Sequence, residues 1–480
     1  MLSRSWSITA VALVTIVFLL DFGVAELPPN YTFMHEATEA PRVSFYDYIV
    51  IGGGTTGIPL AATLSANASV LLLERGGSPY GNPSITNVAN FGTYFFDTSS
   101  SSPSQQFITE GVVNARSRIL GGGTSINAGF YSRGEEQFNI EARLTDETLI
   151  EDSYQWIEKV MVFEPFLGGW QTALRAALVE VGVTPDNGYS YDHVIAGGTT
   201  PLAYGVAFED SFGNMHKAFL KGGENDEIIV SAGALGSPQI LILSGIGPKE
   251  QLDGQNIKSV LQQPLVGKNM SDNPRNGIFI PSPIAVEQSI VQVVGITEFG
   301  SYIEESGGIN LKINGPISTG ELKIENRNPF DNPSVTFNYF KEPEDLQKCV
   351  KGLETILAVI ETEAFSNYTY ANMTAQEILD LNMKLPYNQI VHANTSSSLE
   401  EYCKATVGTM WHYHGGCQIG QVVDDEYKVI GVDGLRVLDA STLLNCPGTN
   451  PQASLMMLGR YMGVKMLAQR LAVTKSYADI

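Results

Sequence analysis

The sequence predicts an α/β fold with a doubly wound parallel sheet, and three neighbouring features indicate it. Residues 49–51 are an uninterrupted apolar run, which is typical of a strand buried on both faces. Residues 52–57, with the sequence GGGTTG, follow that strand directly and predict a tight turn into a helix. Residues 70–73 form a second apolar run after the helical segment. Strand, turn, helix and strand in this order are typical of a nucleotide-binding unit.

The same segment predicts the ligand class. Gly52 and Gly54 lack a Cβ, so the backbone can approach a pyrophosphate, and Gly57 allows the helix expected at 56–65 to pack on the strand. Glu74 follows the second strand, where a carboxylate accepts hydrogen bonds from ribose hydroxyls and repels a 2′-phosphate. FAD or NAD therefore fits this site, and NADP does not.

Composition indicates a folded protein of two to three domains. The chain has 480 residues, 43% of them hydrophobic, and a net charge of −22 that is spread along its length. Such a charge argues against nucleic acid or an anionic membrane surface as a partner.

The N-terminus has the layout of a cleaved secretory signal over residues 1–25. Arg4 precedes an apolar run from Ile8 to Leu20, and small residues follow at 23–25. The apolar run is too short for a membrane anchor, and we expect no membrane span elsewhere. Six sequons fit a glycosylated protein of the secretory pathway, extracellular or in the cell wall, at Asn30, Asn67, Asn269, Asn367, Asn372 and Asn394.

Further glycine-rich segments follow the nucleotide unit. Residues 121–127 place three consecutive glycines, two hydroxyls and an amide where a ligand could contact them. Residues 227–238 predict a strand and a tight turn, with Pro238 in the first turn of the next helix. The C-terminal part contains the segment WHYHGG at 411–416, a strand at 435–441, and a helix spanning 455–471.

Together these motifs resemble the glucose-methanol-choline (GMC) oxidoreductases, in family order over nearly the whole chain after residue 25. The likeness is strongest to the plant branch that contains mandelonitrile lyases and HOTHEAD-type proteins. The segments that carry it are the turn at 52–57, the loop at 116–129, GALGSP at 233–238, SGIG at 244–247, DNPR at 272–275, WHYHGG at 411–416 and LGRYMG at 458–463.

The resemblance implies FAD, bound in the α/β domain beside a second, substrate domain built on an antiparallel sheet. Gly122, Thr124, Ser125 and Asn127 would then lie near the flavin, and Asp439 near the ribityl chain or pyrophosphate. Asn127 stands where some relatives carry a histidine linked covalently to FAD, so we expect noncovalent binding. The implied domain boundaries are 44–135, 190–275 and 405–480 for the FAD-binding domain, and 136–189 and 276–404 for the substrate domain.

The resemblance also assigns catalytic roles. His412 takes the place of the active-site histidine, and Asn450 that of its partner, a position that holds His or Asn across the family. Cys349 and Cys403 match two cysteines that pair in the lyase branch, which leaves Cys417 and Cys446 free. His414 is interpreted as a structural histidine.

The expected function is oxidation of the CH–OH group of an alcohol, with hydride passing to flavin N5; the candidates are a long-chain hydroxy fatty acid, which the HOTHEAD-type likeness implies, and an aromatic alcohol. His412 would remove the hydroxyl proton, and Asn450 would stabilise the developing alkoxide. The alternative is a hydroxynitrile lyase that splits a cyanohydrin into aldehyde and HCN. Three departures weaken it: Asn450 replaces a histidine, Met410 a tyrosine, and no cysteine occurs at 295–306 where that branch has one.

A further alternative is a truncated, inactive family member. Relatives carry several dozen more residues between the segments at 192–198 and 201–206, including a strand that completes the nucleotide sheet and covers the adenine. A second shortening falls at 305–310. Loss of a sheet strand exposes an edge and removes adenine contacts.

Overall fold

The protein is described here from a computed structural model that covers residues 31–87, 90–162, 168–183, 203–286, 290–305 and 308–478. The expected signal sequence, the sequon at Asn30 and the shortened segment at 192–198 lie outside these residues.

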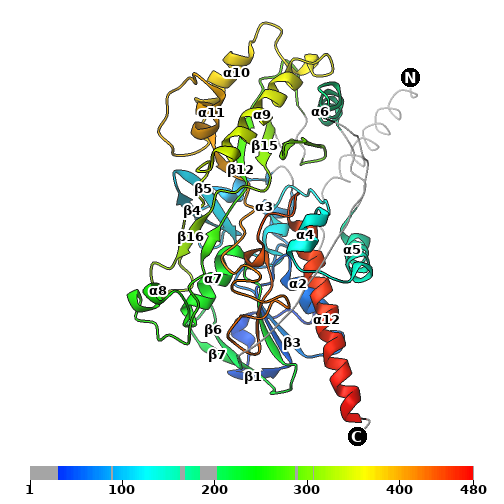
Figure 1. Cartoon of the computed structure of the whole chain (residues 1–480), viewed down its shortest axis with the longest axis vertical. Coiled ribbons are helices and arrows are strands. Elements are labelled where there is room, and N and C mark those ends of the chain that lie inside the picture. Colours follow the sequence, from blue (N-terminus) through cyan, green and yellow to red (C-terminus); the bar gives the residue numbers. More distant parts are fainter. Residues whose placement is uncertain are drawn as a thin grey trace, which may run out of the picture.

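A parallel four-stranded sheet forms the centre of the lower half of the molecule (Figure 1). Its strand order is β19-β8-β2-β3, with bounds Leu435–Val437, Glu227–Val230, Tyr48–Ile51 and Val70–Leu73. Helix α2, Gly57–Leu64, connects β2 to β3, so the predicted strand, turn, helix and strand are confirmed. β3 lies at one edge of this sheet as described, and its four residues are all partly exposed.

An antiparallel sheet organises the upper half (Figure 1). Its order is β13-β14-β15-β12-β18, with bounds Val294–Ile296, Ser301–Glu305, Ile309–Ile313, Pro274–Ile278 and Gly408–Thr409. Strand β15 reads Ile-Asn-Leu-Lys-Ile, and its apolar residues join a core with helix α9, Pro343–Ile360. Gly352 of α9 lies so close to β15 that a Cβ there would meet Leu311 Cδ1 at 2.2 Å. The second sheet therefore has one apolar face covered by α9 and one face free to carry polar groups.

The predicted disulfide is confirmed. Cys349 of α9 and Cys403 of helix α11, Leu399–Thr406, are joined, with their Cα atoms 6.3 Å apart. Cys417 and Cys446 are buried free thiols.

Smaller elements complete the described fold. A three-stranded sheet of order β1-β7-β6 joins Val43–Tyr46, Met215–Leu220 and Gly205–Glu209 beside the parallel sheet. The remaining strands are β4 Ser104–Thr109, β5 Val112–Ser117, β9 Ile246–Gly247, β10 Leu261–Gln262, β11 Lys268–Met270, β16 Gly320–Lys323 and β17 Ser334–Val335. The remaining helices are η1 Ala37–Glu39, α3 Pro83–Thr86, η3 Thr93–Phe95, η4 Gly122–Ser125, α4 Glu136–Glu141, α5 Glu147–Met161, α6 Gly169–Glu180, α7 Gly233–Leu243, α8 Lys249–Gly254, η5 Ser366–Tyr368, α10 Ala375–Asn382 and η6 Ala440–Thr442.

Helix α7 begins earlier than predicted, which makes Pro238 an interior residue instead of a first-turn residue. The Gly233 N–H donates to the carboxylate of Asp439 at 2.9 Å, so the helix start is satisfied by a side chain that is distant in sequence. This long-range contact explains why the local pattern placed the start too late.

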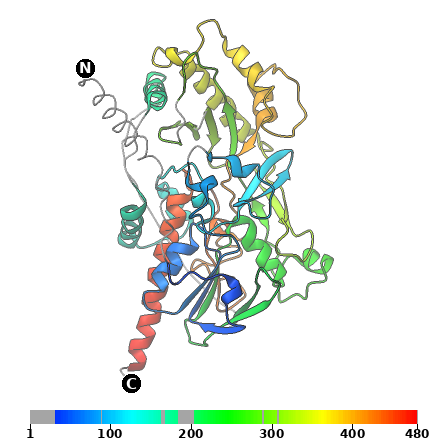
Figure 2. The ribbon, with the colours of Figure 1, turned by 180° about the vertical axis from the view of Figure 1, so that it is seen from behind.

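Helix α12, Gln452–Ala478, runs along the nucleotide half from the middle of the molecule to its lower end (Figures 1 and 2). At 1.5 Å per residue its 27 residues span roughly 40 Å. It packs on α2 at two glycines, because a Cβ on Gly459 would meet Thr56 O at 2.3 Å and one on Gly463 would meet Thr63 Cβ at 2.8 Å. The helix thereby connects the base of the parallel sheet to the loop that precedes Gln452.

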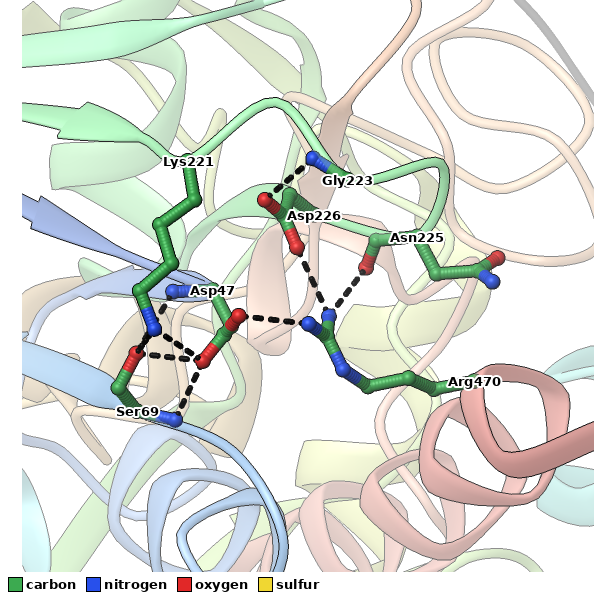
Figure 3. A network of polar contacts seen from close by, with 7 residues as sticks. All are labelled: Asp47, Ser69, Lys221, Gly223, Asn225, Asp226 and Arg470. Atoms are coloured by element: carbon green, nitrogen blue, oxygen red, sulfur yellow. Dashed lines mark hydrogen bonds and ion pairs between the residues drawn. The ribbon is translucent and has the colours of Figure 1, made fainter. Parts of the chain in front are cut away.

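A polar network holds the lower end of α12 in place (Figure 3). Arg470 donates to Asp47 at 2.6 Å and to Asp226 at 2.8 Å, the residues that precede β2 and β8. Lys221 donates to Asp47 and to the Ser69 hydroxyl. Burial raises the pKa of Asp47, but hydrogen bonds from Ser69 and Lys221 and the charge of Arg470 outweigh it and bring the pKa to about 2. The network thus joins α12 to the entrances of two central strands.

Within the part of the chain that the structure describes, no helix is both long enough and apolar enough to cross a membrane.

Candidate active site

The three predicted turn glycines have different structural roles. A Cβ on Gly52, where φ is +112°, would lie 2.3 Å from Ser231 O, and a Cβ on Gly57 would lie 2.1 Å from Gly52 O. These two glycines are therefore required by the protein's own packing. A Cβ on Gly54 would find its nearest protein atom 4.0 Å away. Gly54 leaves open space beside the backbone, as expected where a pyrophosphate approaches.

Glu74 closes the turn from the neighbouring strand end. Its carboxylate accepts hydrogen bonds from the Gly53 N–H at 2.9 Å and the Gly76 N–H at 2.7 Å. Burial raises its pKa, and those two N–H groups oppose the rise. The structure thus places Glu74 against the glycine turn at the end of β3, and its contact with a ribose stays a prediction.

The second glycine loop lies directly on the first. A Cβ on Gly122, where φ is +60°, would meet Gly54 Cα at 2.9 Å, so only glycine permits this approach. The Thr124 hydroxyl is 2.9 Å from the Thr55 hydroxyl, and the Ser125 hydroxyl donates to Leu120 O. Two segments about 70 residues apart in sequence therefore form one glycine-rich surface.

A cavity of about 320 Å³ opens beside this surface. Its lining residues are Ile85, Thr86, Asn87, Phe91, Tyr94, Thr124, Ser125, Ile126, Asn127, Gly129 and Ile290. Asn127 also donates to the Gln452 side chain at the start of α12. Three of the four residues predicted to lie near the flavin, Thr124, Ser125 and Asn127, thus line one cavity, which mixes aromatic walls with hydroxyl and amide groups; Gly122 is not among its lining residues. These residues fit a dinucleotide cofactor. Among the described residues, no group of three or more His, Cys, Asp or Glu side chains could hold a metal ion.

Asp439 lies at the carboxyl end of β19 and is buried. Its carboxylate accepts from the Gly233 N–H, the Ser237 hydroxyl and the Ser441 N–H. The side chain is thus held by protein donors, and its predicted contact with FAD stays a prediction.

The backbone of His412 is held by residues that the sequence reasoning did not select. The His412 N–H donates to Asp272 Oδ1 at 2.9 Å, while Tyr339 and Thr409 each donate a hydroxyl to Asp272 Oδ2 at 2.7 Å. Trp411, just before His412, adopts φ +58°, which a bulky residue rarely does. Burial raises the pKa of Asp272 to about 6, against the effect of these hydrogen bonds. The strained turn and the buried carboxylate together orient His412.

The His412 ring is suited to act as a base. Its Nδ1 is buried and has no hydrogen-bond partner among the described residues. Burial, followed by the charges of Lys312 and His414, holds the pKa of His412 well below its usual range. The imidazole is therefore neutral at physiological pH. His414 is buried as well, and its Nδ1 lies 3.0 Å from the His412 carbonyl oxygen, which fits a structural role.

Lys312 is the most important site residue that the sequence reasoning missed. It is fully buried on β15, and its Nζ donates to Asn450 Oδ1 at 2.5 Å. The same ammonium lies 3.4 Å from Glu304 Oε1 and 3.9 Å from the ring centroid of Tyr302. Lys312 therefore interacts with both predicted catalytic residues: it donates a hydrogen bond to Asn450, and its charge lowers the pKa of His412. The available signal was a lysine inside the alternating strand Ile-Asn-Leu-Lys-Ile.

A second, partly buried cation lies on the same face of the antiparallel sheet. Arg275 of β12 is the cross-strand neighbour of Lys312, donates to Asn310 at 3.0 Å and stands over the Trp411 ring at 5.3 Å. Burial lowers its pKa. The polar face of this sheet therefore presents two cationic groups toward the His412 segment.

Comparison with known proteins identifies two matching family models. The models named GMC oxidoreductase match residues 168–275 and 316–459. Protein HOTHEAD of Arabidopsis thaliana is 42% identical, covering 92% of this chain and 93% of the relative. An (R)-mandelonitrile lyase-like protein of the same plant is 40% identical (92% and 94%), and a sinalpyl alcohol oxidase of Nesocodon mauritianus is 37% identical (91% and 91%).

Solved structures show the same fold. Pyridoxine 4-oxidase from Mesorbium loti has a TM-score of 0.71 at 18% identity, covering 87% of this chain and 98% of that one. Formate oxidase has a TM-score of 0.72 at 17% identity, covering 90% and 99%. The alignment with HOTHEAD extends over 556 positions, more than the 480 residues of this chain, so the relative carries internal residues that this chain lacks.

Proposed function

Because this chain belongs to the GMC oxidoreductase family, we propose that it oxidises a small alcohol with His412 as the base and Asn450 as its partner. The family and its enzyme class agree with the sequence prediction, and FAD is the cofactor that the family implies. The observation that carries the proposal is the His412 ring, whose Nδ1 is buried without a hydrogen-bond partner among the described residues, close enough to the Lys312–Asn450 pair for the Lys312 charge to lower its pKa.

The residues that would hold FAD are the two glycine loops, with Glu74 at the ribose end and Thr124, Ser125 and Asn127 at the cavity. FAD, when bound, supplies an acceptor for the hydride that leaves the carbinol carbon. Asn127 is an amide that cannot form the histidyl bond of some relatives, so we expect the cofactor to be bound noncovalently.

His412 accepts the hydroxyl proton of the alcohol. A neutral imidazole is required for this step, and burial maintains it because desolvation disfavours the protonated ring. Asp272 keeps the His412 backbone in position by accepting its N–H. Removal of a positioned base costs about 10²- to 10⁴-fold in rate.

Asn450 stabilises the oxygen that loses this proton. Its side chain is bonded to the Lys312 ammonium, and a hydrogen-bond donor held in a dry site stabilises developing negative charge without reorganisation.

A second candidate is cyanohydrin cleavage, and one observation favours it. The buried Lys312 and the partly buried Arg275 would contribute to the positive potential that a departing cyanide requires. Three sequence features differ from the lyase pattern and argue against it: Asn450, Met410 and the absence of cysteine from residues 295–306. Oxidation is therefore the better supported function.

The names of the relatives suggest the substrate class. The sinalpyl alcohol oxidase points to an aromatic alcohol, and the aromatic walls of the cavity formed by Phe91 and Tyr94 suit one. A long-chain hydroxy acid is the other expectation from the HOTHEAD-type likeness. We also propose that the protein enters the secretory pathway, supported by its N-terminal layout and by a disulfide, which an oxidising compartment favours.

The test uses the protein purified without residues 1–25. We expect a visible flavin spectrum that bleaches when benzyl alcohol is added without oxygen. His412→Ala should keep its flavin and lose roughly 10²- to 10⁴-fold in bleaching rate. His392→Ala, a remote histidine, serves as the control and should match the parent.

Other outcomes separate the alternatives. HCN release from mandelonitrile without bleaching by any alcohol would establish the lyase. A colourless parent that gains no flavin when FAD is added would support the truncated, inactive form. Undiminished turnover in His412→Ala would remove the assignment of the base.

A further inference from the structure

The Lys312 contact determines which end of the Asn450 amide is available to a substrate. A lysine ammonium has three donors and no acceptor, so the amide atom that faces it must be the oxygen. The structure has this arrangement, with Lys312 Nζ donating to Asn450 Oδ1. Asn450 Nδ2, which carries two donors, is consequently directed elsewhere.

Lys312 is itself held firmly enough to impose that orientation. It lies on β15 between the hydrogen-bonded strands β12 and β14, opposite Tyr302, and its side chain is fully buried. The Tyr302 ring lies 3.9 Å below the ammonium, and the Glu304 carboxylate lies 3.4 Å away. Neither Glu304 oxygen has a hydrogen-bond partner among the described residues, so this carboxylate is available to Lys312 as a counter-charge, and its charge also acts on Arg275.

Orientation matters because the two ends of an amide have opposite effects on an alkoxide. An N–H group stabilises the developing negative charge, whereas a carbonyl oxygen repels it. A free asparagine turns about its last torsion, which is broad and roughly two-fold. A bond from a fixed cation removes the unproductive orientation.

We propose that Lys312 is a positioning residue that acts through Asn450, holding the amide with its N–H₂ group toward the substrate oxygen, with Glu304 neutralising the buried ammonium. This proposal rests on the proposed function and specifies a residue that neither the family models nor the relatives' names assign. The competing explanation is that Lys312 acts on the alkoxide directly as a charge, independently of Asn450.

A double-mutant cycle distinguishes the two explanations. The variants are Lys312→Met, Asn450→Ala and the double variant, with kcat and KM for benzyl alcohol measured alongside bound flavin. Lys348→Met is the control, because that lysine lies on α9 outside the site and donates to backbone carbonyls instead of to Asn450. The control should behave as the parent.

If Lys312 acts through Asn450, Asn450→Ala loses about 10²- to 10³-fold in kcat, the usual effect of removing one such donor. Lys312→Met then loses about 10- to 100-fold in kcat in the parent, but less than about 3-fold in the Asn450→Ala background, because coupled residues are not additive. KM changes little. Equal losses in both backgrounds would overturn the proposal while leaving the proposed function intact.

Asn450→Asp provides a second test that does not remove the lysine. Aspartate has the shape of asparagine and accepts from Lys312 at either oxygen, so the fold and the flavin should persist. It has no donor, so kcat should fall at least as far as in Asn450→Ala. Benzoate, monitored by the shift that it causes in the flavin spectrum, should bind more weakly to Asn450→Asp and Lys312→Met than to the parent.

The outcomes are separable from those of the proposed function. Full kcat or unchanged benzoate binding in Asn450→Asp overturns the orientation of the amide. If the parent itself binds no flavin, or if no alcohol bleaches its flavin, the proposed function is refuted. The proposed role of Lys312 is then refuted as well, because it depends on that function.

Discussion

Gly54 should be replaceable without harm to the fold but not without loss of FAD. In Gly54→Ala the new Cβ finds its nearest protein atom 4.0 Å away, which is ordinary contact, and this residue does not have positive φ. Replacing such a glycine stabilises by about 0.4–1 kcal/mol through the unfolded chain. The apo protein should therefore melt at the parent's temperature or slightly above it.

The same methyl group should obstruct the cofactor. It projects into the space where the turn meets the pyrophosphate, and overpacking costs about 1–3 kcal/mol. Such a cost weakens FAD binding by roughly 5- to 150-fold. The variant should be isolated with little or no yellow colour.

Gly57→Ala should show the opposite balance. Its Cβ would lie 2.1 Å from Gly52 O, so helix α2 must move away from β2. This change should destabilise the apo protein by at least about 1–3 kcal/mol. Gly254→Ala is the control, because a Cβ there meets nothing within 4 Å and the residue lies on α8, far from the turn.

The assay pairs circular-dichroism melting of FAD-stripped protein with flavin absorbance after reconstitution. The reasoning is refuted if Gly54→Ala regains a full complement of FAD with parental affinity, or if its apo form melts as low as Gly57→Ala.

Three further outcomes are expected. Folding raises the pKa of Asp272 from 3.8 to about 6, so ionisation of this carboxyl destabilises the folded protein: the penalty is absent below pH 4 and reaches its full size above pH 6. Relative to Asp272→Asn, the free energy of unfolding of the parent should fall by roughly 3 kcal/mol between pH 4 and pH 7, measured by denaturant titration. Cys349→Ser with Cys403→Ser opens a loop of 54 residues and should lower the free energy of unfolding by roughly 3–4 kcal/mol, and identical melting of reduced and oxidised parent would contradict this. Glycopeptide mapping should find glycan on the exposed Asn67 but not on Asn269, which is partly buried and whose amide donates to Gln418 at 2.8 Å; occupancy at Asn269 would show that this contact does not persist.

Local patterns were sufficient wherever the structure itself is local. The apolar run at 49–51, the glycines after it and the strand ending at Glu74 occur within 30 residues, and each constrains its neighbours through backbone geometry. The helix expected at 56–65 is observed as α2, Gly57–Leu64, and it follows from the same kind of short-range information.

Predictions from sequence were less accurate where contacts between distant segments determine the structure. Pro238 was expected in a first turn, but Asp439, about 200 residues later, satisfies the start of α7 and moves it upstream. The disulfide required the family likeness, because four cysteines alone leave several pairings open.

The sequence by itself determined the nucleotide turn, the cofactor class and the family, because these depend on short motifs whose spacing survives in one dimension. Only the tertiary structure decided that Lys312, Asp272 and Glu304 surround His412 and Asn450. A lysine within a strand reads as a solvent-facing charge in sequence. Its burial becomes evident only when α9 covers one face of the antiparallel sheet and the loop before α12, 138 residues after Lys312, packs against the other face, because burial depends on contacts between segments that are distant in sequence.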